Sequence, residues 1–192
     1  MRLFVAIEIP THTKNELISG YSEVKARLDM AGRGAVKWVQ PQNWHITLKF
    51  LGEVPEKLYE RCTYILTSCA HQYTPFKMRI RHIGCFPTPK RPKVLWAGVE
   101  EAVETLSPMS ACLEEAFEEI GIAREGRGFH AHLTFGRVKK FAPGMAQAMV
   151  DCLSTRVQSD WFEVRNLNLY KSVLTPKGPI YSLIFKASLA DR

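Results

Sequence analysis

The stretch HITLKF at residues 45–50 is matched in pattern by HLTFGR at residues 132–137. Each copy places a histidine and a threonine two positions apart, in a run that alternates with apolar residues. Alternate side chains of a β-strand point to the same face of the sheet. The pattern therefore predicts two strands, each with its histidine and threonine on one face and apolar residues on the other.

The residues that follow each threonine leave alternatives open. On an ideal strand Lys49 shares the face of His45, where it either binds a phosphate or lies solvated beyond the site. Arg137 is out of phase with Thr134, and it reaches the polar face only if the strand ends or bulges at Gly136. There its guanidinium would bind a phosphate in bidentate fashion, and otherwise it is a charge at the sheet rim.

Two histidines that approach a phosphorus atom from opposite sides suit an in-line displacement. A neutral imidazole removes a proton from the attacking oxygen, and a protonated one supplies a proton to the leaving oxygen. The ordinary histidine pKa, near 6.5, makes both states accessible around neutral pH. Thr47 and Thr134 would donate hydrogen bonds to the non-bridging phosphate oxygens. Opening a strained cyclic phosphate in this way needs no metal, and we expect no cofactor.

Other candidate residues lie mostly outside the pairs of His and Thr. Arg79 and Arg81 share one face of an alternating strand, and such a basic stripe either follows a sugar-phosphate backbone or is a solvated face. Phe86 is either a base-stacking partner or a core residue. His130 and His132 form an H-x-H pair, but no cluster of carboxylates or thiols accompanies it, so we expect no metal site. The candidates for nucleic-acid contact are Lys49, Arg79, Arg81, Phe86, Arg127 and His130.

Composition is typical of a globular protein. The chain has 192 residues, 46% of them hydrophobic, and we expect residues 1–192 to form a single domain. The net charge of +7 favours nucleic acid as a partner, although solvated lysines give the same excess.

Five cysteines without a CxxC pair favour a reducing, cytoplasmic location. No apolar run approaches the length of a membrane span, and we expect a monomer that does not bind membranes.

The order of the expected elements is that of a loose duplication. Each motif strand follows a helix and is itself followed by a helix and a pair of strands. Ser107 and Pro108 predict the N-cap and the first residue of the third helix. Few connections resemble parallel crossovers, so we expect an α+β fold with two mostly antiparallel sheets. The helical apolar stripes lie at 17–28, 58–69, 113–120 and 144–154, and the strands at 3–9, 38–50, 76–83, 94–99, 162–174 and 180–189.

With their flanks, the two motifs resemble the two-histidine phosphoesterase superfamily, and within it the RNA 2′,3′-cyclic phosphodiesterase family, also called 2′-5′ RNA ligase-like proteins. That family implies a bilobal α+β fold with a pseudo-two-fold duplication, outer helices and an active site in the central cleft. The resemblance covers nearly the whole chain. It rests on RLFVAIEIP (2–10), WVQPQNWHITLKFLGEV (38–54), Phe86-Pro87, HAHLTFGR (130–137) and LNLYKSVL (167–174).

The resemblance also implies roles for the motif residues. His45 corresponds to the proton donor and His132 to the proton acceptor, a choice that the spacing alone leaves open. Thr47 and Thr134 would hold the phosphate of an RNA 2′,3′-cyclic end during its hydrolysis to a 2′-phosphate. Some members of the family also join RNA ends reversibly through a 2′-5′ linkage without ATP. The alternative is an RNA- or nucleotide-binding module of the same fold without turnover, against which the four intact His and Thr positions weigh.

Overall fold

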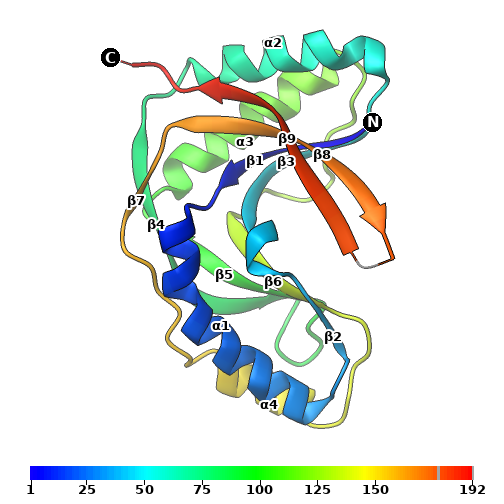
Figure 1. The fold of residues 1–192 in the computed structure, drawn as a ribbon, viewed down its shortest axis with the longest axis vertical. Helices are drawn as coiled ribbons and strands as arrows, with labels where there is room; N and C mark the ends of the chain where they lie inside the picture. The colour runs from blue at the N-terminus through cyan, green and yellow to red at the C-terminus, as the bar shows by residue number, and fades with distance from the viewer. Residues whose placement is uncertain (177, 192) are drawn as a thin grey trace.

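A computed structural model describes residues 1–176 and 178–191 (Figure 1). The helices are α1 (Thr11–Ala31), α2 (Tyr59–Ala70), α3 (Val103–Glu118) and α4 (Met145–Cys152), with the 3-10 turns η1 (Pro41–Asn43) and η2 (Glu56–Leu58). The strands are β1 (Arg2–Glu8), β2 (Val36–Trp38), β3 (His45–Glu53), β4 (Phe76–Phe86), β5 (Val94–Glu100), β6 (His132–Val138), β7 (Phe162–Val164), β8 (Asn166–Thr175) and β9 (Gly178–Ser188). In this part of the chain no helix is long and apolar enough to span a membrane.

The strands follow one another in a single curled path rather than in two separate sheets. Their order is β7-β4-β5-β6-β3-β1-β8-β9, with β2 paired to the side of β6. Every pairing between the described strands is antiparallel, as the sequence predicts. The two motif strands, β3 and β6, are neighbours in the middle of the path and pair only at Ile46 and Leu133. The predicted α+β class is confirmed, and the two halves meet at the two motifs.

The helices cover one face of this sheet. In Figure 1, α2 and α3 lie over the half that contains β3, β8 and β9, while α1 and α4 lie at the other end beside β2. The apolar stripe predicted for α1, from Leu17 to Leu28, is buried. Val5, Ile7 and Ile46 are fully buried in the core cluster that these helices complete. The side chains that alternate with them therefore point to the helix-free face.

The third helix begins earlier than its sequence signal predicts. It starts at Val103, and Pro108 lies inside it rather than at its first position. The backbone N–H of Leu106 donates to the carbonyl of Ala102, 2.8 Å away, which forms the first turn before the proline. Leu106 is buried on the same stripe as Leu113, so burial of Leu106 outweighs the hydrogen bond that proline cannot donate.

Candidate active site

The first motif lies on β3 and contains a β-bulge. Against β1, Thr47 is opposite Ala6, the register then skips Leu48, and Lys49 is opposite Val5. A bulge adds one residue to a strand and so reverses the face of the side chains that follow it, up to the next irregularity, which in β3 falls at Leu51. His45 and Thr47 share the helix-free face as predicted, whereas Lys49 lies on the helix-covered face.

The placement of Lys49 corrects the expectation that it shares the face of His45. Its side chain is fully buried, and its ammonium donates to the Glu114 carboxylate at 2.5 Å and to the Ala123 carbonyl at 3.2 Å. A buried lysine is stabilised by such a partner. Lys49 therefore ties β3 to α3 and to the loop after it, and the prediction that it contacts phosphate or RNA is wrong. Strict alternation would place Phe50 on the apolar face of the strand. It instead pairs with Phe4 and lies half exposed on the histidine face.

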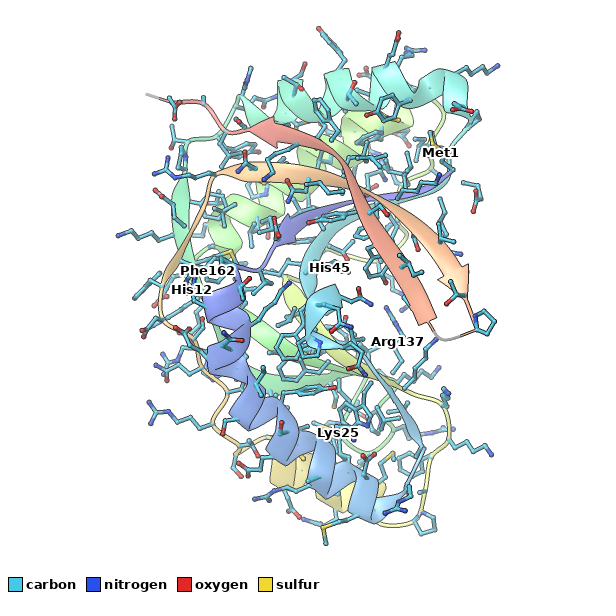
Figure 2. The ribbon with its side chains drawn as sticks, in the orientation of Figure 1. Met1, His12, Lys25, His45, Arg137 and Phe162 are labelled. Carbon is cyan, nitrogen blue, oxygen red and sulfur yellow. The ribbon has the colours of Figure 1, made fainter. Side chains whose placement is uncertain are left out.

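The second motif, on β6, has a bulge at the equivalent residue. Against β5, Thr134 is opposite Trp96, the register skips Phe135, and Arg137 is opposite Val94. The bulge on which the placement of Arg137 depends is therefore present, at Phe135, one residue earlier than Gly136. It places Arg137 on the face of Thr134. In each motif the fourth residue, Leu48 or Phe135, is thus the bulged one, and the sixth residue, Phe50 or Arg137, lies on the histidine face. Figure 2 labels Arg137 and His45 in the central part of the molecule, and the charge of Arg137 acts on the pKa of His45.

The two imidazoles are held in the same way. Nδ1 of His45 lies 2.8 Å from the carbonyl oxygen of Asn43, and Nδ1 of His132 lies 2.7 Å from that of His130. A carbonyl oxygen only accepts hydrogen bonds, so Nδ1 carries the proton in both residues. Nε2 is then the nitrogen that accepts a proton as a base or, once protonated, donates it as an acid. This geometry equips either histidine for either role.

Both histidines are neutral at neutral pH. Burial lowers the pKa of His45 to about 4, and the positive charges of Lys14 and Arg137 act in the same direction. Burial also lowers the pKa of His132, with His130 and Arg137 contributing. An anion close to an imidazole stabilises its protonated form. A bound phosphate would therefore raise the pKa of both groups and favour the protonated imidazole that an acid catalyst needs.

Aromatic side chains surround each histidine. The ring of His45 lies 4.8 Å from Phe4 and 5.2 Å from Tyr181, centroid to centroid. The ring of His132 lies 5.3 Å from Phe86 and 6.4 Å from Trp96. Sequence reasoning missed Phe4, Tyr181 and Trp96 as parts of this site. Alternation in the first strand could have placed Phe4 on its polar face, but Tyr181 reaches His45 only through the β8–β9 hairpin.

The remaining predicted residues separate into two groups. Phe86 and His130 adjoin the second motif, with their rings 5.0 Å apart and in edge contact. Arg127 is exposed on the loop before β6.

Arg79 and Arg81 share a face as predicted, but both form ion pairs with the same acidic residue, Glu100, at 3.2 and 2.9 Å. Arg79 also pairs with Glu101 at 2.6 Å. The basic stripe is therefore largely neutralised by carboxylates of the neighbouring strand.

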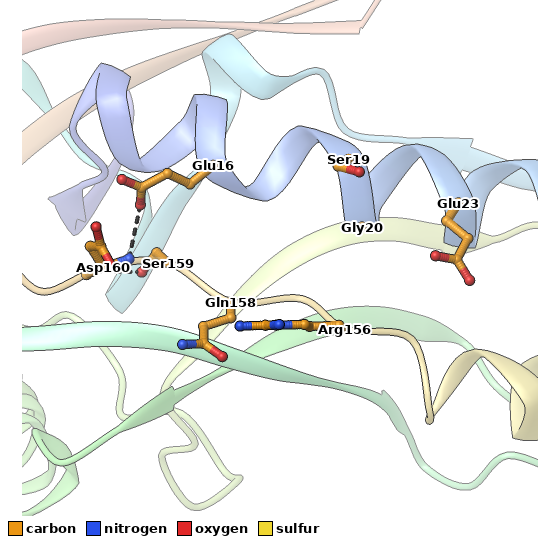
Figure 3. Close-up of a pocket in the computed structure, with 8 residues that line it drawn as sticks. All are labelled: Glu16, Ser19, Gly20, Glu23, Arg156, Gln158, Ser159 and Asp160. Carbon is orange, nitrogen blue, oxygen red and sulfur yellow. Dashed lines mark hydrogen bonds between the residues drawn. The ribbon is translucent and has the colours of Figure 1, made fainter.

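A cavity of about 410 Å³ lies elsewhere, between α1 and residues 156–160 (Figure 3). Its walls include Glu16, Gly20, Arg156 and Asp160, and the backbone N–H of Asp160 donates to the Glu16 carboxylate. None of the motif residues lines it. We therefore assign the site by the paired histidines and not by this cavity.

Two adjoining strands that each present a histidine and a threonine on the open face of a curled sheet define a two-histidine phosphoesterase. The chain matches the LigT like Phosphoesterase model over residues 7–96 and 98–181, and each segment contains one motif. The chain belongs to the LigT-like phosphoesterase family. The match in two segments also agrees with the duplication that the sequence predicts.

Curated relatives extend along nearly the whole chain. The RNA 2′,3′-cyclic phosphodiesterase of Archaeoglobus fulgidus is 39% identical over 185 residues, covering 94% of this chain and 96% of the relative. That of Methanocaldococcus jannaschii is 33% identical over 186 residues, covering 96% and 98%.

Solved structures share the fold. The crystal structure of TT0787 of Thermus thermophilus has a TM-score of 0.80 and 29% identity, covering 98% of each chain. E. coli LigT complexed with 3′-AMP has a TM-score of 0.73 and 21% identity, covering 99% of this chain and 98% of the other.

Proposed function

We propose that this protein hydrolyses the 2′,3′-cyclic phosphate at RNA ends by acid/base catalysis with two histidines. The observation that carries the proposal is the repeated arrangement of His45 and His132. Each has its Nδ1 bound to the carbonyl two residues before it and its Nε2 left for the reaction. The curated relatives named RNA 2′,3′-cyclic phosphodiesterase support the choice of substrate.

In the proposed reaction His132 takes a proton from water as the water oxygen attacks phosphorus. The bond from phosphorus to the ribose 3′ oxygen breaks, and His45 gives its proton to that oxygen, so the phosphate stays on the 2′ oxygen. Thr47 and Thr134 donate to the non-bridging oxygens, and Arg137 balances their negative charge. The bulge in β6, which turns Arg137 toward the site, supports this last role.

The phosphate position in the product tests the direction of the reaction. We expect phosphorus NMR of the products from adenosine 2′,3′-cyclic phosphate to show 2′-AMP, with authentic 2′- and 3′-AMP as standards. The two motifs are nearly symmetric, so the assignment of donor and acceptor rests on the family resemblance. A product that is mainly 3′-AMP would require the roles of His45 and His132 to be exchanged.

We further propose that hydrolysis needs no metal or cofactor, because the two imidazoles supply both proton transfers. A metal-bound hydroxide would otherwise do this work. We expect turnover to be the same with EDTA and after addition of Zn²⁺ to chelator-treated protein. Loss of turnover with EDTA that Zn²⁺ restores would contradict the proposal and direct attention to His130 and His132.

If the 5′ hydroxyl of a second RNA attacks phosphorus in place of water, the same ring opening breaks the bond to the 3′ oxygen and leaves a 2′-5′ diester, and we include this reversible 2′-5′ ligation in the proposal. A binding module without turnover is the alternative, and it predicts tight binding of cyclic-ended RNA without product.

We also propose that the two lobes act as one domain, and that the protein is a monomer in the cytoplasm. Cysteines that are free throughout the described residues support the reducing location.

A further inference from the structure

Positive charge continues from Arg137 onto the next strand. Lys37 of β2 lies directly opposite Arg137 of β6. Paired residues of neighbouring strands share a face of the sheet, at a strand spacing of about 4.8 Å. Lys37 therefore lies on the side that carries His132 and Thr134, one strand beyond Arg137. Both basic side chains are exposed.

Backbone hydrogen bonds bring more lysines to the same place. The carbonyl of Lys93 accepts from the N–H of Val138 at 2.9 Å, which sets Lys93 beside the end of β6. The N–H of Lys139 donates to the carbonyl of Ala35 at 2.7 Å, which sets Lys139 beside the start of β2. These side chains are exposed. We call these exposed lysines around the ends of β6 and β2 the basic corner, and its members are Lys37, Lys93, Lys139 and Lys140. Strand pairing places Lys37 on the histidine face, and backbone hydrogen bonds place the other three next to it.

The basic corner differs from the stripe of Arg79 and Arg81 in its ion pairing. Within residues 1–176 and 178–191, neither its four lysines nor Arg137 form a salt bridge, whereas Arg79, Arg81 and Arg124 all do. Like charges directly opposite each other on two strands destabilise a sheet. Lys37 and Arg137 are such a pair, and an anionic ligand would relieve their repulsion.

We propose that the basic corner binds the sugar-phosphate backbone of single-stranded RNA next to the cyclic end. The RNA then leaves the histidines along β6 and β2, past Arg137, rather than across the neutralised stripe of Arg79 and Arg81. This inference rests on the proposed function and adds the path of the substrate to it. Phosphate contacts by lysines are sequence-independent, so the corner favours longer RNA without selecting its sequence.

The test compares the double variant Lys37→Gln/Lys139→Gln with a matched control, Lys57→Gln/Lys77→Gln. The control removes the same charge from two exposed lysines outside the corner. Binding of a fluorescent oligoribonucleotide that ends in a 2′-phosphate is measured from 50 to 200 mM salt. This readout needs no turnover, so it is independent of whether the protein hydrolyses the cyclic end. Turnover of cyclic-ended oligonucleotide and of adenosine 2′,3′-cyclic phosphate is measured beside it.

Each lysine that contacts a phosphate of single-stranded RNA adds about 0.7 to the slope of log affinity against log salt. Over this range the wild type should lose roughly sevenfold more affinity than the corner variant, and the control should behave as the wild type. The ratio of kcat/KM for the oligonucleotide to that for the mononucleotide should fall only in the corner variant. A corner variant with the wild-type salt slope would overturn the proposal. An acidic protein partner would then be the alternative ligand for the corner. Absence of turnover by the wild type, with the slopes as expected, would contradict the proposed function and not the path.

Discussion

At the scale of single residues, the site depends on where two protons reside. The carbonyls of Asn43 and His130 fix a proton on Nδ1 of His45 and His132, so only Nε2 changes its protonation during the reaction. Burial lowers the pKa of both imidazoles, and both are unprotonated at pH 7 before substrate binds. A general acid must be protonated. The anionic substrate therefore does more than dock, because its charge favours uptake of the catalytic proton.

This arrangement predicts the pH dependence of catalysis. The profile of kcat/KM reports the free enzyme, in which one histidine must be protonated and the other neutral. Both pKa values are lowered, so kcat/KM should be bell-shaped, with its maximum below the ordinary histidine pKa of about 6.5. The profile of kcat should lie at higher pH, because bound phosphate raises the pKa of the pair. A flat kcat/KM profile, or a maximum at a pH above the ordinary histidine pKa, would contradict paired imidazole catalysis.

At the scale of elements, the two bulges decide which side chains belong to the site. Both fall at the fourth motif residue, Leu48 and Phe135, and both reverse the faces of the later side chains in the strand. Alternation along the sequence is sufficient to place the His and Thr of each motif together. It fails after the threonine because a bulge is set by pairing with β1 and β5, which are distant in sequence. Alternation therefore misplaces Lys49, and it places Arg137 only conditionally.

Other limits of the sequence have similar causes. The shared face of Arg79 and Arg81 follows from alternation, but their ion pairs involve Glu100 on a neighbouring strand whose register no local pattern gives. The start of α3 is mispredicted because a proline usually marks the first helical turn. Burial of Leu106 extends the helix beyond that local signal. Local chemistry therefore predicts the faces of elements, and long-range packing decides their partners and ends.

The position of Lys49 gives a prediction about stability. Replacing it in Lys49→Met leaves the mostly buried carboxylate of Glu114 without its ion-pair partner. Breaking a buried pair in this way typically lowers the free energy of unfolding by about 3–5 kcal/mol. We expect a loss of that order in urea unfolding, and a smaller loss in the double variant Lys49→Met/Glu114→Leu.

Activity provides the control for this variant. Lys49 lies on the face opposite His45, so the folded fraction of Lys49→Met should retain the wild-type KM for adenosine 2′,3′-cyclic phosphate. A variant with unchanged stability and a raised KM would mean that Lys49 binds the substrate phosphate after all.

At the scale of the whole molecule, the site belongs to neither half alone. One half supplies His45 from β3 and the other supplies His132 from β6, and these strands pair only at Ile46 and Leu133. In a regular antiparallel ladder of this register the two histidines would be diagonal neighbours, with Cβ atoms about 7–8 Å apart. A phosphate between them would contact both halves at once. The duplicated fold thus gives an in-line displacement its two opposite proton-transfer groups.

The central claim, that His45 and His132 act as one acid/base pair, is tested most directly by kcat/KM for the two single alanine variants and the double variant. The substrate is adenosine 2′,3′-cyclic phosphate, and circular dichroism confirms that each variant is folded. Each single variant should lose roughly a hundred- to ten-thousand-fold. The double variant should lose little more than the worse single, because residues that act as a unit are not additive. A single variant with nearly wild-type kcat/KM, or a double variant whose loss equals the product of the two single losses, would contradict the account.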